Sequence, residues 1–365
     1  MLDDHKIAFI TCVNEEAEYA ECRYYLEKLQ VPDGYTVEIM SIREAPSMTA
    51  GYQAAMMDSD AKYKVYLHQD VFIINDYFIE DMLTVFARDE KIGMLGVIGK
   101  KGIRCTLRDM LKALDTGKVI YNNMIMNEGH IERESHTEVM MADGLLLATQ
   151  YDIPWREDIL DGWDFYDVSQ CIEFQQAGYK VVIPYQEEIW CCHDGVCLEM
   201  VRFFDQYVKF RQEYAHVLEA SSETEQEDLL FCEKNKYYAQ KRRALKEGIA
   251  ALLTVGERAG ARRVFQDPEL EKDQYLMEYR DIVHIDLLEE QAQEPVRFWQ
   301  DGMTVSQLVL KLHILKYALK RIEYEAGDAG TIEILEGYSR YAIKEVCSRY
   351  VAYQGRVLQK LGILF

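Results

Sequence analysis

YKVYLHQDV, at residues 63–71, contains a strand signal that ends in three polar residues. Residues 63–67 are rich in aromatic and branched side chains, which favour a strand. His68, Gln69 and Asp70 then follow at its carboxyl end. In sheets whose strands alternate with helices, ligands bind beyond the carboxyl ends of the strands. The segment therefore predicts a ligand site at His68, Gln69 and Asp70, although a polar turn after a strand would show the same pattern.

Strand and helix signals alternate on both sides of this segment. Such alternation predicts an α/β fold with a mixed sheet and helices on both faces. From about residue 200 the pattern changes to long helices, including an apolar stripe at 308–322. We therefore expect two domains, an α/β domain at 1–200 and an α-helical domain at 201–365. The expected strands are 6–12, 36–41, 63–67 and 92–98, and the expected helices are 15–30, 49–57, 75–88 and 231–253.

The charge of the chain excludes some partners. The 365 residues include 63 acidic and 41 basic side chains, which gives a net charge of −22. Nucleic acids and anionic membrane surfaces need a basic footprint, so neither is expected as the main partner. Residues 1–200 carry 36 acidic and 17 basic side chains, and 11 of these acids but only two bases lie at 151–200. This local excess of acid favours a bound cation.

The sequence also indicates a compartment. No signal peptide is recognisable at the start, and no apolar run is long enough for a transmembrane helix. The nine cysteines are an odd number, and several lie within apolar runs, which is typical of reduced thiols rather than of a disulfide framework. We therefore predict a cytoplasmic protein without a transmembrane segment.

Two further segments contain candidate catalytic or metal-binding residues. DGWDFYD at 161–167 combines three carboxylates, which can accept a hydroxyl proton, with aromatic rings that suit sugars. WCCHDG at 190–195 contains His193, a candidate metal ligand, but lacks the C-x2-C spacing of common zinc sites. The alternative for 161–167 is an acidic loop with an aromatic anchor. The alternative for His193 is a structural histidine. The phosphate-loop, dinucleotide, G-x-S-x-G and H-E-x-x-H signatures are absent from the sequence.

Together, four stretches resemble a family 2 glycosyltransferase with the GT-A nucleotide-sugar fold. Within that family, the chain resembles the branch related to the streptomycin-biosynthesis glycosyltransferase-like proteins. The likeness covers about residues 5–197 and does not include 201–365. The stretches are CVNEE at 12–16, APSMTAGYQAAM at 45–56, YLHQDV at 66–71 in the place of the D-x-D motif, and an acceptor-side group made of 143–144, 161–171, 177–179, Trp190 and His193.

The resemblance implies a role for each matching residue. Asp70 and His193 would hold a divalent cation, Mn2+ or Mg2+. Asp167 would be the general base, with Asp164 as the other candidate for that role. Asp143 and Trp163 would shape the acceptor pocket. The residues that would contact the nucleotide-sugar donor are Val13, Asn14, Glu15, Ser47, Gly51, Gln53, Gln69 and Asp70.

Three positions depart from the family pattern. His68 replaces the first acid of the D-x-D motif, and Tyr166-Asp167 stands where the family has an E-D pair. Ser41-Ile42-Arg43-Glu44 stands where the family often has an acidic pair after its second strand, which implies a different recognition of the nucleotide base. Imidazole can bind a transition metal such as Mn2+ but lacks the charge of a carboxylate, so the metal requirement depends on His68.

The expected function is an inverting glycosyltransferase that moves a sugar from a nucleotide diphosphate to an acceptor hydroxyl of a sugar or glycoconjugate. A degenerate GT-A domain that serves as a binding or scaffold protein is one alternative. A GT-A-like sugar nucleotidyltransferase is the other. The helical region has no assigned role, and its stripe at 308–322 could form a homodimer or pack within the chain.

Overall fold

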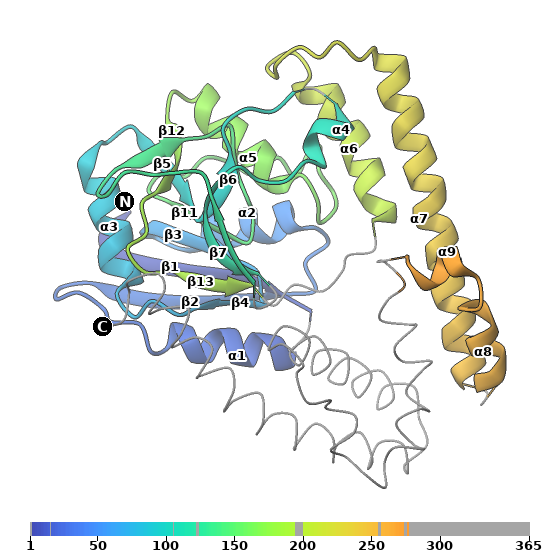
Figure 1. The fold of residues 1–365 in the computed structure, drawn as a ribbon. Coiled ribbons are helices and arrows are strands. Elements are labelled where there is room, and N and C mark those ends of the chain that lie inside the picture. Colours follow the sequence, from blue (N-terminus) through green and yellow to red (C-terminus); the bar gives the residue numbers. More distant parts are fainter. Residues whose placement is uncertain are drawn as a thin grey trace, which may run out of the picture. The chain divides into compact units, whose positions relative to one another are not determined.

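The computed structural model describes residues 2–14, 16–104, 106–121, 124–193, 200–254, 257–273 and 276 (Figure 1). The chain divides into two compact units, Met1–Tyr237 and Tyr238–Phe365, which are considered separately below. The first unit extends beyond the α/β region into helices, so it ends later in the chain than residue 200. A functional boundary at residue 200 stays a prediction.

A seven-stranded mixed sheet forms the centre of the first unit. Strand β1 is parallel to β2 and β3, whereas β11 is antiparallel to both β3 and β5. This arrangement confirms the predicted mixed α/β fold. In sheet order the strands are β2 (Thr36–Arg43), β1 (Asp3–Val13), β3 (Ala61–Leu67), β11 (Leu146–Thr149), β5 (Ile92–Gly96), β12 (Lys180–Pro184) and β9 (His136–Glu138).

A second sheet continues from the first. The predicted strand 92–98 is divided between the two sheets, because β5 ends at Gly96 and β6 begins at Ile98. Strands β4 and β13 are antiparallel, with His193 opposite Val71. The order of this sheet is β10 (Met141–Ala142), β6 (Ile98–Lys100), β7 (Thr116–Tyr121), β13 (Cys191–His193) and β4 (Val71–Ile73), and β8 (Met124–Glu128) pairs with β7.

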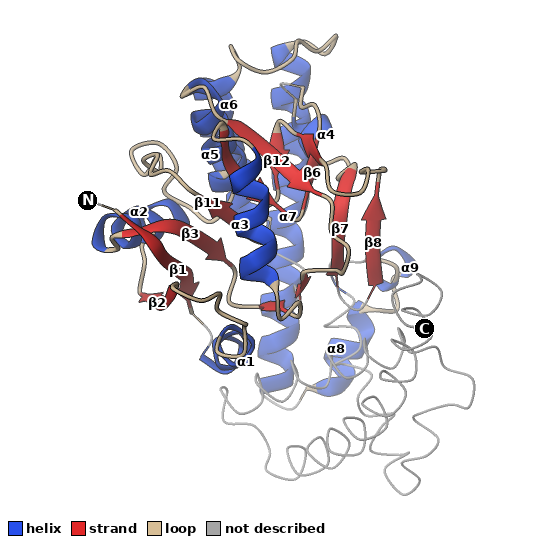
Figure 2. Ribbon diagram, turned by 90° about the vertical axis from the view of Figure 1, so that its left-hand side faces the viewer, coloured by secondary structure: helices blue, strands red, loops and turns tan. Residues whose placement is uncertain are grey.

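Helices cover both faces of the central sheet, as predicted. Alternate side chains of a strand point to opposite faces, and β1 follows this rule. Ile7 and Phe9 pack in one buried cluster with α1 (Glu16–Leu26) and α3 (Phe78–Arg88). Ala8 and Ile10 pack in the other cluster with α2 (Met48–Asp58) and α5 (Tyr166–Gln176). In Figure 2, α3 lies in front of the strands.

The described residues after 200 are helical, as predicted. Within the second unit, Ile249, Ala261, Phe265 and Leu276 form a small apolar cluster. The predicted stripe at 308–322 lies outside the described residues. No helix among the described residues has the length and apolar character needed to cross a membrane. The helices are α6 (Val201–Tyr214), α7 (Glu225–Thr254), α8 (Arg258–Val264) and α9 (Pro268–Glu271), and a short α4 (Leu107–Met110) precedes them in the chain.

Candidate active site

Three potential metal ligands meet where β3 ends. The backbone turns after Leu67, and the pairing of β13 with β4 brings His193 beside this turn. Asp70 Oδ1 lies 3.3 Å from His193 Nε2 and 3.9 Å from His68 Nδ1. One ligand atom from each of the three side chains lies within 4.8 Å of the other two. This donor set fits a divalent cation, so the predicted pair of Asp70 and His193 gains His68 as a third candidate ligand.

The pKa values of His68 and Asp70 are shifted toward the protonation states that bind a metal ion. Burial, together with the nearby His193, lowers the pKa of His68 and so favours the neutral imidazole that binds metals. For Asp70, burial alone would raise the pKa. The hydrogen bond from His193 and the charges of the two imidazoles outweigh burial, and the pKa of Asp70 is lowered.

The ends of two parallel strands are joined beside the cluster. Asn14 follows β1 and Gln69 follows β3, and the two residues make a reciprocal pair. The Asn14 backbone N–H donates to Gln69 Oε1 at 2.9 Å, and Gln69 Nε2 donates to Asn14 Oδ1 at 2.5 Å. Val13 is buried at the end of β1, and Glu15 lies outside the described residues. The structure therefore brings Asn14 and Gln69 next to Asp70, at the sheet edge where a ligand is expected.

Three other predicted donor residues have packing or capping contacts. Ser47 Oγ accepts from the Ala50 backbone N–H and caps α2. A Cβ at Gly51 would lie 2.5 Å from the Cys12 sulfur, so glycine lets α2 approach β1 closely. Gln53 Oε1 accepts from the Trp155 backbone N–H at 2.8 Å. These contacts explain the three residue types locally, and their roles toward a donor stay predictions.

Asp167 lies in the first turn of α5, within a buried acidic environment. The Gly144 backbone N–H donates to Asp167 Oδ2 at 3.0 Å, and Asp143 Oδ1 accepts from the Leu145 backbone N–H. A Cβ at Gly144 would come within 2.1 Å of the Tyr166 hydroxyl, so only glycine permits this packing. Burial, with a further contribution from the charge of Asp143, raises the pKa of Asp167 to about 7. Asp167 can therefore exchange a proton near neutral pH.

The residues just before α5 are fixed by α6. Phe165 has the left-handed φ of +62°, which is rare for a side chain of this size, and stacks on Phe210 of α6 at a ring distance of 5.1 Å. Beside it, burial raises the pKa of Asp164 to about 6. Trp163 is 37% exposed. The packing of Phe165 thus fixes the backbone at the segment that contains Trp163 and Asp164, directly before α5.

Tyr166 connects the two groups of candidate residues. Its hydroxyl lies 2.5 Å from His68 Nε2, so a hydrogen bond joins the start of α5 to the end of β3. Asp143 also contributes to the electrostatic environment of both His68 and Asp167. Tyr166 was not predicted as a site residue from the sequence. The available signal was that His68 and Tyr166 both depart from the family pattern.

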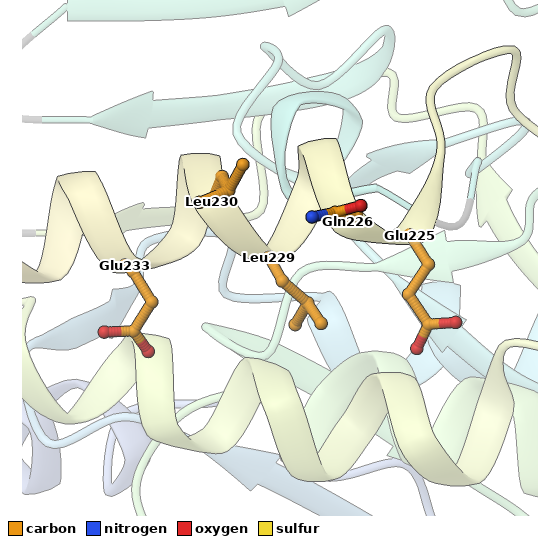
Figure 3. A pocket seen from close by; sticks show the side chains of 5 residues that line it. All are labelled: Glu225, Gln226, Leu229, Leu230 and Glu233. Atoms are coloured by element: carbon orange, nitrogen blue, oxygen red, sulfur yellow. The ribbon is translucent and has the colours of Figure 1, made fainter.

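A groove elsewhere in the first unit contains none of these residues. It lies along the first turns of α7 and is lined by Glu225, Gln226, Leu229, Leu230 and Glu233 (Figure 3). Glu225, Leu229 and Glu233 point to the same side of α7. The candidate active site is therefore the cluster at the ends of β3 and β13 together with the start of α5.

Comparison with known proteins identifies the family. A model of the glycosyltransferase-like family matches residues 8–214, more than half of the chain. The chain belongs to this glycosyltransferase-like family. The match contains the predicted donor, metal, base and acceptor residues, from Val13 to His193. A search of curated proteins found no match for this glycosyltransferase-like chain.

The solved structures that resemble this chain include the following two proteins. The mannosyltransferase PcManGT from Pyrobaculum calidifontis, solved with GDP-Man and Mn2+, is 12% identical with a TM-score of 0.41; the alignment covers 86% of this chain and 87% of that one. TarS 1–349 from S. aureus is 10% identical with a TM-score of 0.37, covering 95% and 91%. At these low values, the family model remains the basis of the assignment.

Proposed function

We propose that this chain is an inverting glycosyltransferase of the family 2 type that moves a sugar from a nucleotide diphosphate to an acceptor hydroxyl. The observation that carries the proposal is the hydrogen bond between His68 and Tyr166. It joins a cluster of cation ligands to the helix turn that holds a buried carboxyl group with a raised pKa. Membership in the branch that resembles streptomycin-biosynthesis proteins belongs to the same proposal.

The donor side lies at the carboxyl ends of β1 and β3. Asn14 and Gln69 would contact the nucleotide, with Val13, Glu15, Ser47, Gly51 and Gln53 as the other predicted donor residues. Asp70 and His193 would hold the divalent cation. When bound, such a cation offsets the charge that develops on the leaving diphosphate.

The acceptor side lies at the start of α5. An acceptor hydroxyl is a weak nucleophile, so a carboxylate must take its proton during attack. Asp167 is our choice for this base, because a pKa of about 7 combines a large deprotonated fraction with useful basicity. Asp164 is the other candidate, and Asp143 and Trp163 would contact the acceptor. One base without a covalent intermediate accounts for inversion at the anomeric carbon.

Two properties remain predictions from the sequence. They are a cytoplasmic location and a homodimer formed through the helical region.

The test is a ligand screen of the full chain by thermal shift, with UDP, GDP and dTDP sugars in the presence and absence of Mn2+. We expect a nucleotide diphosphate sugar to stabilise the protein and Asp70→Asn to abolish that stabilisation. Exposed Asp33→Asn is the matched control and should bind like the wild type. Stabilisation by a nucleoside triphosphate alone would favour a nucleotidyltransferase, and stabilisation by neither class would favour a scaffold.

A further inference from the structure

We propose that one face of α7 docks on a bilayer that contains anionic lipids. The face is made of Leu230, Lys234, Tyr237 and Lys241, and is called the outward face below. The proposal goes beyond the proposed function and does not depend on it. Helix α7 follows the region that the family model matches and contains none of the candidate site residues.

The middle of α7 concentrates positive charge in a chain with an excess of acid. Residues 234–246 hold six bases and no acid, whereas the whole chain has a net charge of −22. Charges further away than about 8 Å are largely screened at physiological ionic strength. Local charge therefore decides what this part of the helix attracts. The net charge argues against an anionic membrane as the main partner of the chain, but it does not exclude one at this run.

The outward face combines apolar and cationic side chains. Its residues are spaced by four, three and four positions, so they lie in line along the helix. Leu230 and Tyr237 are each 63% exposed, and Lys234 and Lys241 are exposed as well. In Figure 3, Leu230 projects away from the side of α7 that lines the groove. The buried Cys232 marks the packed side of the helix, so the outward face is turned to solvent.

The two lysines of the outward face differ from other bases of the run. Three of those bases are held by acids of the protein. The pairs are Lys236 with Asp205 at 2.5 Å, Arg242 with Asp273 at 2.8 Å and Arg243 with Glu247 at 3.0 Å. Among the residues that the structure describes, no acid forms an ion pair with Lys234 or Lys241. Their charges are therefore available to an external anion.

This set of side chains fits a lipid surface better than a polymer in solution. Tyrosine rings favour the level of the headgroups, and aliphatic side chains reach the acyl boundary. Lysines extend along apolar surface and place their charge beside the phosphates of anionic lipids. A soluble polyanion would use Lys234 and Lys241 but would leave Leu230 in water. The bilayer is the partner that uses the whole face.

The experiment is co-sedimentation of the full chain with vesicles of phosphatidylcholine alone, or of equal parts phosphatidylcholine and phosphatidylglycerol. We expect binding to the anionic vesicles only. Raising NaCl from about 0.1 M to about 1 M should abolish it, because the screening length falls from about 10 Å to about 3 Å. Lys234→Ala together with Lys241→Ala should lower the affinity about 30-fold, since each base beside an anionic surface contributes about fivefold.

Leu230→Ser tests the apolar part of the face and should lower the affinity about tenfold. Lys91→Ala together with Lys101→Ala is the matched control, because it removes the same charge from exposed lysines outside α7. This control should bind like the wild type. Circular dichroism checks that each variant is folded, and glutamine replaces alanine at both lysines of the outward face if the alanine pair does not fold.

Binding to neither kind of vesicle, equal binding to both, or wild-type binding by the Lys234 and Lys241 pair would overturn the proposal. Dextran sulfate distinguishes a lipid surface from a soluble polyanion. If it binds as tightly as the anionic vesicles, and Leu230→Ser binds both like the wild type, the face recognises a charged polymer and the bilayer is excluded. None of these results bears on the proposed transfer, which is tested by nucleotide-sugar binding at the ends of β1 and β3.

Discussion

Two buried carboxyl groups in the first unit, Asp228 and Asp167, have opposite electrostatic surroundings. Asp228 is completely buried, accepts the Leu107 backbone N–H at 2.8 Å and the Tyr207 hydroxyl, and pairs with Arg211 Nε at 3.1 Å. Asp167 accepts the Gly144 N–H, and no ion pair to it exists within the described part of the chain. The charge that contributes to its raised pKa is that of another acid, Asp143.

The difference separates a structural acid from a reactive one. A buried carboxylate with a cationic partner and several hydrogen-bond donors holds those partners together, which for Asp228 are α4, α6 and α7. A buried carboxylate without a cation favours its protonated form and can take up a proton near neutral pH. Burial alone therefore does not mark a functional acid, whereas the lack of a compensating cation does.

The largest expected effect is on transfer. Asp167→Asn should lower kcat by about 10²–10⁴-fold, the range for loss of a general base, and leave donor binding unchanged. Asp158→Asn is the control, because Asp158 is paired with Arg156 on the surface. Steady-state rates and donor titrations of both variants give the comparison. Unchanged turnover in Asp167→Asn would leave Asp164 as the base.

The next effect is on folding. Asp228→Ala should lower the free energy of unfolding by about 3–5 kcal/mol, because Arg211 would lose its buried partner and the Leu107 N–H its acceptor. Urea denaturation measures the change, and Asp205→Ala, which removes an exposed acid of α6, is the control. A loss below about 1 kcal/mol, the range of surface pairs, would remove the distinction between the two acids.

A smaller effect concerns the pH dependence of transfer. The base must be deprotonated, so kcat/KM should rise with pH through about 7, the pKa of Asp167. The charge of Asp143 raises that pKa, so Asp143→Asn should move the midpoint to lower pH. This shift is expected whatever the variant does to the maximal rate. A midpoint that stays in place or moves to higher pH would show that Asp143 does not act on the base.

The fold follows from local patterns, and part of the site does too. Residues 36–41 and 63–67 carry strand signals, and both form strands of the central sheet on either side of β1. The polar residues at the end of such a strand indicate a ligand site. The division at Val97 between two sheets leaves no local signal, because strand propensity continues through it. The contact of Tyr166 with His68 spans 98 residues and depends on the placement of α5 against β3, which no spacing rule supplies. Asp228 was missed for the same reason.

Asp167 is buried without a cationic partner among the described residues. The most direct test of this property is the free energy of unfolding of the wild type and of Asp167→Asn between pH 4 and pH 9. An acid whose pKa is about 7 in the fold and about 3.9 when unfolded stabilises the fold only while protonated. That contribution is complete below pH 4 and is lost as the pH rises to 7. Asn cannot lose a proton. Asp167→Asn should therefore become progressively more stable than the wild type between pH 4 and 7, by at most on the order of 4 kcal/mol, with a constant difference above that pH. A difference that does not change with pH would contradict the account.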